Sequence, residues 1–485
     1  MPAAPTGSAS FRDPENAAYL HGGSWYRVAG PSSSAALTLL LTSPLYSQLV
    51  TAGSIVAYEL ATVETTREVV SAYAVASGRS PQPGACVFHV AAVPLITYPW
   101  EWPNSMLEAA ARLTLTLRMQ LLDIGLDLKD ASAFNVQFIG MHPVFIDIGS
   151  IEVWRPNPSW NASRQFIENF INPLAVGSGA HVTAADAWEL SRHRGLKSDA
   201  ARQLLPKAKR RSMSLRLLQA TTRPVAANAP SESKFAERAA RNKDLALKAT
   251  LGLTRRLIKQ IEKLHGTAHS TTWVDYGSRE HYGTEDLLRK SDFAADFVSA
   301  APGRGDLVLD VGGNDGFTAA HLVRTTGARV VVLDADAGAL DVLYAGISTT
   351  ADLVGQITPM LGDITNLMPA AGLLDAEFGA FTSRVHPTAV TCQAVLHHVV
   401  ITQGTPMGFA VDALARFGAP VQIEFANEED EKVRILLSQI PNWQGAYSTE
   451  VLLGALRARF EFVEVAGTTS PTRVVVNAWN QVKVT

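Results

Sequence analysis

The sequence predicts an α/β fold for the C-terminal part, a doubly wound and mostly parallel sheet that ends in an antiparallel hairpin, preceded by an α+β domain. After residue 266, short β-rich runs (VLDV, RVVVLD, AVTCQAVLH, VQIEFA) alternate with helical patterns, as in a parallel sheet with crossover helices. The chain closes on FEFVEVAG and RVVVNAW around TTSPT, which predicts the hairpin. With 485 residues and 47% hydrophobic composition, two or three domains are expected, with a boundary near residue 266.

The net charge of −3 is unevenly distributed. Residues 191–265 carry 19 basic and 5 acidic side chains, whereas residues 266–485 carry 14 and 25. The basic stretch has helical spacing, with TTRPVAANAPSES as a loop between its helices. Its cations form either solvated helix faces or a surface for an anionic partner. Only Phe235 is interleaved among them, so base stacking has little support and nucleic acid is an unlikely partner.

Targeting and cysteine patterns indicate a cytoplasmic protein. The first residues lack a basic stretch followed by an apolar one, and the apolar run 35–41 is far shorter than the roughly 20 residues of a membrane span. Cys86 and Cys392 are the only cysteines and match no metal-ligand spacing. We therefore expect no membrane span, no disulfide framework and no structural metal.

The glycine-rich stretch Asp310-Val-Gly312-Gly313-Asn314-Asp315-Gly316 follows a predicted strand and opens a predicted helix. Glycine lets the backbone turn sharply and approach a ligand, and the helix N-terminus behind it favours polar or anionic groups. Asp334 ends the next strand about 20 residues on, where a carboxylate accepts both hydroxyls of a ribose. Asp363, in LGDIT after a third strand, is placed to reach an adenine amino group.

These motifs resemble those of the class I S-adenosylmethionine-dependent methyltransferases. LDVGGNDG is similar to their first motif, VVVLDAD to the second and LGD to the third. Asn314 replaces the usual middle glycine and tolerates left-handed backbone angles. The glycines do not match the G-x-G-x-x-G spacing of dehydrogenases, which disfavours nicotinamide. The resemblance implies a seven-stranded sheet and S-adenosylmethionine as the cofactor, although a doubly wound domain without cofactor stays open.

The likeness extends to a narrower family. WVDYGSREHY, AVLHHVVIT and VQIEFANEEDEKV, with LKDASAFNVQF and PVFIDIGS in the first half, resemble bacterial methyltransferases related to the host-specificity-of-nodulation proteins. Tyr282 is assigned to the cofactor site, because methyltransferases of this class often fold the segment before the first motif, which also contains Trp273 and Tyr276, over the cofactor. Ordinary packing is the alternative for these aromatics.

Three residues are candidates for the methyl-transfer step. His397 and His398 follow the strand AVTCQAVL, at the edge where ligands of open α/β sheets lie, and imidazole titrates near neutral pH. Glu424, in VQIEF, is predicted at an equivalent edge. Each is a candidate base, and each has a structural alternative. Because the D/N-P-P-Y signature of nitrogen methyltransferases is absent, a hydroxyl acceptor is favoured.

An earlier stretch resembles the catalytic loop of phosphotransferases related to protein kinases. Asp130 would orient an acceptor hydroxyl, Asn135 five positions on would hold a metal, and Asp147 in a D-x-G turn would hold metal against the phosphates. Residues 1–128 contain no lysine to grip those phosphates, and GGSWYRVAG lacks the G-x-G-x-x-G loop. Arg27 or Arg67 is the available substitute, although a guanidinium is not interchangeable with an ammonium.

We therefore predict two domains: residues 1–265, kinase-like and degenerate with the basic segment 191–265 as its helical end, and residues 266–485, a methyltransferase. The leading hypothesis is O-methylation of a small-molecule, glycan or metabolite acceptor, with the first domain recruiting substrate. One alternative is a bifunctional Mg-ATP phosphotransferase and methyltransferase. The other is a non-catalytic protein that docks an acidic partner through residues 191–265.

Overall fold

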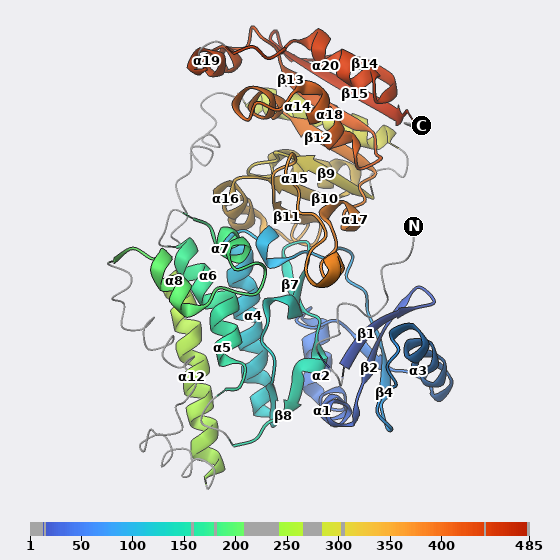
Figure 1. Cartoon of the computed structure of the whole chain (residues 1–485), viewed down its shortest axis with the longest axis vertical. Coiled ribbons are helices and arrows are strands. Elements are labelled where there is room, and N and C mark those ends of the chain that lie inside the picture. The colour runs from blue at the N-terminus through green and yellow to red at the C-terminus, as the bar shows by residue number, and fades with distance from the viewer. Residues whose placement is uncertain are drawn as a thin grey trace. The chain divides into compact units, whose positions relative to one another are not determined.

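The computed structural model describes residues 13, 16–156, 160–178, 182–207, 242–264, 284–301, 306–440 and 443–482. The chain forms two compact units, coloured along the sequence in Figure 1. The first comprises residues 1–268 together with 370–379, and the second comprises residues 269–369 and 380–485. The predicted division into 1–265 and 266–485 did not anticipate that residues 370–379 pack with the first unit.

The first unit begins with a four-stranded antiparallel sheet of order β1-β2-β4-β3. Its helix α3 (Val63–Ser77) starts at Thr62, whose side chain accepts a hydrogen bond from the Thr65 amide, and stops at Gly78 in the left-handed conformation. The helix packs on the sheet through Val69 and Tyr73. The other elements of this part are β1 (Asn16–His21), β2 (Ser24–Ala29), α1 (Pro31–Leu41), α2 (Pro44–Thr51), β3 (Tyr58–Leu60) and β4 (Cys86–Val90).

The rest of the first unit is mainly helical. The long helix α4 (Asn104–Asp123) is buried along one face, and α12 (Lys243–Leu264) lies against it, as Figure 1 shows. Arg118 of α4 joins them: its guanidinium pairs with Asp127 at 2.7 Å and donates to Thr254 of α12 at 2.7 Å. The neighbouring helices are α5 (Ser163–Phe166), α6 (Asn172–Gly177), α7 (Ala184–Leu190) and α8 (Ser198–Leu204).

Short strands flank the residues of the first unit that the sequence predicts as kinase-like. Two of them form the antiparallel pair β6 (Val136–Ile139) and β7 (His142–Phe145). The second pair, β5 (Leu126–Leu128) and β8 (Ile151–Val153), lies just outside them in the sequence. Asp130 and Asn135 therefore lie on the connection between β5 and β6, and Asp147 lies between β7 and β8.

The second unit contains a seven-stranded sheet of order β11-β10-β9-β12-β13-β15-β14. All neighbours are parallel except β15, which pairs antiparallel with both β13 and β14. The predicted fold class is thereby confirmed, including the terminal hairpin. The strands are β9 (Leu307–Val311), β10 (Arg329–Asp334), β11 (Ile357–Leu361), β12 (Ala389–Gln393), β13 (Val421–Ala426), β14 (Phe460–Ser470) and β15 (Arg473–Gln481).

Helices connect the strands of the second unit. Helix α16 (Ala337–Ile347) starts at Asp336, whose carboxylate accepts from the Gly338 and Ala339 amides and so caps the orphan donors of the first turn. Helices α14 and α15 pack together, as do α18 and α20. The remaining bounds are α14 (Thr284–Ala300), α15 (Phe317–Thr326), α17 (Phe381–Arg384), α18 (Met407–Ala415), α19 (Glu431–Gln439) and α20 (Thr449–Arg457).

Candidate functional site

The glycine-rich turn links the ends of two central strands. The Gly312 amide donates to the Leu333 carbonyl at 2.7 Å, which ties the end of β9 to the end of β10. Gly312 has a φ of +69°, and a Cβ there would lie 2.2 Å from a methyl of Val395. Asn314 has a φ of +48°, in the left-handed region that the sequence led us to expect for it. The turn therefore needs glycine for its conformation and for close packing.

The Asp334 carboxylate, at the end of β10, holds the turn in place. One oxygen accepts from the Asn314 amide at 3.0 Å and the other from the Asp336 amide at 2.9 Å. An ionised carboxylate has about four acceptor positions, so each oxygen keeps capacity for a further donor. Burial raises the pKa of Asp334 to about 6, and the hydrogen bonds from the two amides oppose part of this shift. The half-buried carboxylate is therefore ionised at neutral pH and able to accept hydroxyl donors.

Asp310, the fourth residue of β9, lies beneath the turn and is buried. One carboxylate oxygen accepts from the Thr391 hydroxyl at 2.8 Å, and the other forms no hydrogen bond with any described residue. Burial raises the pKa of Asp310 to about 6, and the Thr391 hydrogen bond opposes the shift. A Cβ at Gly313 would lie 2.6 Å from the Asp310 carboxylate, so Gly313 lets the turn cover this group.

Asp363 follows β11, and the residue before it, Gly362, is hydrogen-bonded to Asp334. The Gly362 amide donates to the Asp334 backbone carbonyl at 2.9 Å. One carboxylate oxygen of Asp363 accepts from the Thr365 hydroxyl at 2.7 Å, and the other accepts from the Gln403 side chain at 2.8 Å. Gln403 was missed in the sequence because nothing local connects it with LGDIT. The carboxyl ends of β9, β10 and β11 thus place the turn, Asp334 and Asp363 along one edge.

The two histidines follow β12. His397 is 2% exposed, and neither of its ring nitrogens has a hydrogen-bond partner among the described residues. Its ring centroid lies 4.0 Å from that of His398. Burial lowers the pKa of His397 to about 3 and that of His398 to about 4. Val395, which packs over Gly312, lies two residues before His397, so the histidine segment adjoins the glycine-rich turn.

Glu424 is within β13, two residues before its end, and is 1% exposed. One oxygen accepts from the Thr469 hydroxyl at 2.6 Å, and the other lies 3.5 Å from the Lys290 ammonium. The side chain therefore joins β13 to α14 and β14. A catalytic role for it stays a prediction, and this geometry gives it structural partners instead. Tyr282, with Trp273 and Tyr276, lies outside the described residues.

The three residues predicted as kinase-like in the first unit form two side-chain pairs. The Asn135 side-chain amide donates to the Asp130 carboxylate at 3.0 Å, so these two residues contact each other. Asp147 instead pairs with Arg27 of β2 at 2.9 Å. Burial raises the pKa of Asp147, and Arg27 offsets part of this shift. Of the two candidate substitutes for the missing lysine, Arg27 reaches the site, while Arg67 is an exposed residue of α3.

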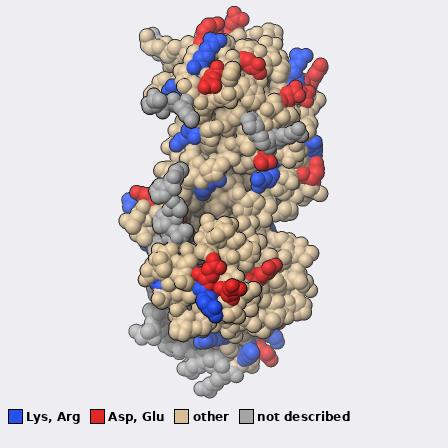
Figure 2. Space-filling view, turned by 90° about the vertical axis from the view of Figure 1, so that its right-hand side faces the viewer, with Lys and Arg blue, Asp and Glu red and all other residues tan. Residues whose placement is uncertain are grey.

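Among the residues that the structure describes, no three His, Cys, Asp or Glu side chains gather as a metal site. Figure 2 shows a face on which acidic and basic side chains are intermixed. Of the basic segment 191–265, residues 208–241 and 265 lie outside the described ranges. No described helix combines the length and the apolar composition that crossing a membrane requires.

Comparison with known proteins gives a sequence relative that covers most of the chain. No protein-family model matches the chain. The nodulation protein NoeA of Rhizobium meliloti (strain 1021) is 29% identical over 371 residues, which cover 76% of this chain and 76% of NoeA. This likeness confirms the resemblance to nodulation proteins that the sequence motifs predicted.

Solved structures give weaker matches. Monomeric WbdD is 20% identical with a TM-score of 0.29, covering 44% of this chain and 45% of WbdD. A structure described as the bifunctional kinase-methyltransferase WbdD is 22% identical with a TM-score of 0.27, and the match covers 40% of this chain and 38% of the WbdD chain. Magnesium protoporphyrin IX methyltransferase (ChlM) from Synechocystis PCC 6803 with bound SAH is 15% identical with a TM-score of 0.30, and the match covers 44% of this chain and 95% of the ChlM chain. This chain thus spans less than half of each WbdD chain.

The sheet order carries the assignment of the second unit. The strands β9 to β14 follow the order of a doubly wound sheet, and the last strand, β15, is inserted antiparallel between β13 and β14. The glycine-rich turn lies at the end of the central strand β9. The chain is therefore similar to NoeA over 76% of its length, and its second unit has the predicted fold of the class I S-adenosylmethionine-dependent methyltransferases.

Proposed function

We propose that this class I methyltransferase transfers the methyl group of S-adenosylmethionine to a hydroxyl oxygen of a small-molecule, glycan or metabolite acceptor, and that its first unit recruits the acceptor. The observation that carries the proposal is the pairing of the Asn314 amide with the Asp334 carboxylate at 3.0 Å. It places a half-buried carboxylate beside a glycine-rich backbone turn at the edge of the sheet where ligands of open α/β sheets bind.

The residues present fit such a cofactor. Asp334 has unused acceptor capacity for the two ribose hydroxyls, and we assign it that role. The backbone at 312–316 would take the methionine end, and Asp363 would accept from the adenine amino group. Thr365 and Gln403 already bond the Asp363 carboxylate, which fixes its orientation. A buried Asp310 oxygen without a partner among the described residues leaves a further acceptor under the turn.

Methyl transfer to a hydroxyl forms a carbon–oxygen bond, breaks the carbon–sulfur bond and releases one proton from the acceptor to solvent. The cofactor, when bound, supplies the methyl group as a sulfonium and leaves as the neutral thioether. The protein contributes mainly alignment. His397 and His398 are neutral at pH 7 because burial lowers the pKa of both, and a neutral imidazole nitrogen accepts a hydrogen bond. We propose His397 as the group that orients the acceptor hydroxyl, with His398 as the second candidate.

The proposal is tested by calorimetric titration with S-adenosylmethionine of the wild type and of Asp334→Ala. We expect micromolar binding that weakens at least about tenfold in the variant, a loss of about 1.4 kcal/mol. Asp352→Ala is a matched control, because Asp352 is an exposed carboxylate of the same unit that pairs with Arg324. No binding by the wild type, or equal binding by Asp334→Ala, would contradict the assignment.

For the first unit, we infer a degenerate kinase-like domain that serves as a scaffold. A guanidinium paired with Asp147 at 2.9 Å occupies the carboxylate that a phosphate-bound metal would need. The bifunctional alternative requires that Arg27 release Asp147, and it predicts Mg-ATP turnover that Asp147→Ala abolishes. The non-catalytic alternative predicts binding of an acidic partner that weakens steeply with salt and survives Asp334→Ala.

A further inference from the structure

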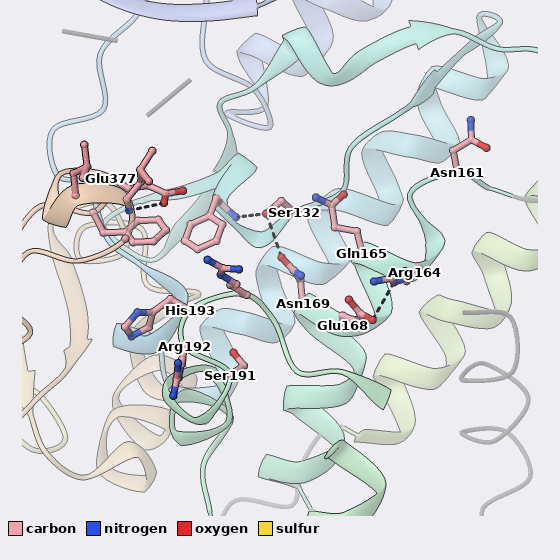
Figure 3. Close-up of a pocket in the computed structure, with 16 residues that line it drawn as sticks. Ser132, Asn161, Arg164, Gln165, Glu168, Asn169, Ser191, Arg192, His193 and Glu377 are labelled. Atoms are coloured by element: carbon pink, nitrogen blue, oxygen red, sulfur yellow. Dashed lines mark hydrogen bonds and ion pairs between the residues drawn. The ribbon is translucent and has the colours of Figure 1, made fainter. Parts of the chain in front are cut away.

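A cavity of about 1130 Å³ lies in the first unit beside the loop that carries Asp130 and Asn135. It is larger than the roughly 300–1,000 Å³ of most ligand pockets, so it has room for more than one sugar-sized ring. Figure 3 shows its wall: in this view Glu377, His193 and Arg192 lie at one end, and Asn161 and Arg164 lie at the other.

Side chains of the cavity wall hold the kinase-like loop. The Gln165 side-chain carbonyl accepts from the Ala131 amide at 2.9 Å, and that of Asn169 accepts from the Ala133 amide at 3.1 Å and the Ser132 hydroxyl at 3.2 Å. Hydrogen bonds among the described residues use only the carbonyl oxygen of each amide, which leaves both NH₂ groups as donors. The cavity therefore lies where an acceptor oriented by the loop would be placed.

The cavity wall carries three arginines against two carboxylates, Glu168 and Glu377, which leaves one positive charge in excess. Arg164 pairs with Glu168 at 3.1 Å. Arg192 and Arg194, in contrast, form no ion pair with any residue within the described ranges. Both are exposed, and they lie on either side of His193, whose pKa is lowered by burial, so the ring is neutral at pH 7. Two available guanidiniums at one cavity favour an anionic group on the ligand.

The cavity wall also has strained backbone. Arg192 and His193 have φ values of +52° and +60°, two consecutive residues other than glycine in the left-handed region. Across the wall, Leu374 and Asp375 have φ values of +55° and +53°. Such conformations are unfavourable for residues other than glycine and are concentrated at ligand sites. Strain in two separate loops of one cavity therefore indicates a constrained binding wall.

Aromatic rings close one side of the cavity. Phe378 stacks on Phe134 with ring centroids 5.1 Å apart and lies edge-on to Trp100 at 5.2 Å. The His193 ring lies 4.0 Å from the Trp100 ring. Phe378 belongs to a closed loop, since its amide donates to the Ala371 carbonyl at 2.9 Å. The wall thus combines apolar ring faces, amide donors and guanidiniums.

We propose that this cavity binds a saccharide that carries a phosphate or a carboxylate group. Ring faces pack against the apolar face of a sugar, the amides of Gln165 and Asn169 bond its hydroxyls, and Arg192 and Arg194 bind its anionic group. The inference rests on the proposed function in one respect, because it names the class of acceptor that the first unit recruits. The anionic sugar itself would bind without S-adenosylmethionine.

The test is calorimetric titration of the full chain, at fixed low ionic strength, with glucose 6-phosphate, glucuronate, glucose, inorganic phosphate and AMP. We expect both anionic sugars to bind and glucose and phosphate to bind at least about tenfold more weakly. The double variant Arg192→Gln/Arg194→Gln is expected to weaken the anionic sugars by about tenfold or more. Arg67→Gln, which removes an exposed arginine of the same unit, is the matched control and is expected to change nothing.

Each other outcome overturns the proposal. Equal binding of glucose would remove the role of the anion, and unchanged binding by the double variant would remove the role of the arginines. Tighter binding of AMP than of the sugars would assign the cavity to nucleotides, and no binding of either anionic sugar would end the proposal outright. A parallel titration of the double variant with S-adenosylmethionine, expected to match wild type, separates failure here from failure of the methyltransferase proposal.

Discussion

Protonation of Asp334 should control cofactor affinity. Both oxygens of this carboxylate accept backbone amides, and the proposed ribose contacts need the acceptor positions that remain. A proton on one oxygen replaces an acceptor with a donor directed at the ribose or at an amide. We therefore expect S-adenosylmethionine to bind more weakly as pH falls through the pKa of about 6 that burial gives Asp334.

The size of the effect follows from that pKa. Nearly every molecule has the ionised carboxylate at pH 7.5, but only about one in ten does at pH 5. If only the ionised form binds, the apparent Kd rises about tenfold between these pH values, or about 1.4 kcal/mol. Lowering the pH from 7.5 to 5 does not destabilise the fold through the buried carboxylates Asp310 and Asp334. Because the folded pKa values of Asp310 and Asp334 are raised above 3.8, their contribution to stability is complete below about pH 4 and is lost as pH rises through about 6.

The assay is calorimetric titration at pH 7.5, 6.5, 5.5 and 5.0, with circular dichroism to verify folding at each pH. Asp334→Asn should bind weakly at all four values and lose the pH dependence, because an amide has one acceptor oxygen for two backbone donors. Asp336→Asn is the control, since asparagine also caps a helix and the Asp334 carboxylate is intact. Wild-type affinity that is constant from pH 7.5 to 5.0, or a pH dependence that persists in Asp334→Asn, would refute the reasoning.

Three further predictions follow from the same structure. Gly312→Ala should destabilise the chain by about 1–3 kcal/mol and weaken S-adenosylmethionine binding, because the added Cβ would meet a methyl group of Val395. Gly327→Ala is the control: Gly327 has a similar φ but nothing within 4 Å of an added Cβ, so urea unfolding should show only the cost of the backbone strain. The His397 ring should stay neutral from pH 8 to 5, so ring-proton NMR that shows it titrating near 6.5 would contradict its burial. Wild type should show no Mg-dependent ATP binding by calorimetry while Arg27 pairs with Asp147, and magnesium-dependent binding at micromolar ATP would favour the bifunctional alternative.

The positions of the glycine-rich turn, Asp334 and Asp363 were predictable because they depend on local pattern. Asp334 and Asp363 each follow a run of β-rich residues, and the carboxyl ends of parallel strands meet at one edge of a sheet. The glycine at 312 follows from the turn between strand and helix, where the observed φ is +69°. Such signals lie within a few residues of the group they position, so a single sequence is enough to place them.

The environment of Glu424 was not predictable in the same way. Its strand runs to Ala426, two residues past it, because β15 pairs antiparallel with β13 along its whole length. Its partners Lys290 and Thr469 lie 134 residues before it and 45 residues after it in the sequence. Strand ends and buried ion pairs depend on such distant partners, and a local pattern has no information on them.

Residues 370–379 show the same limit at the scale of a domain. AAGLLDAEFG has the composition of a loop, and the neighbouring sequence on both sides belongs to the second unit. Its place in the first unit depends on aromatic contacts between Phe378 and Phe134 or Trp100, residues more than 240 positions earlier. The Gly379 amide adds a hydrogen bond to the Tyr98 hydroxyl at 2.9 Å. Replacing this loop by a short linker would therefore remove one wall of the first unit's cavity and leave every strand pair of the seven-stranded sheet in place.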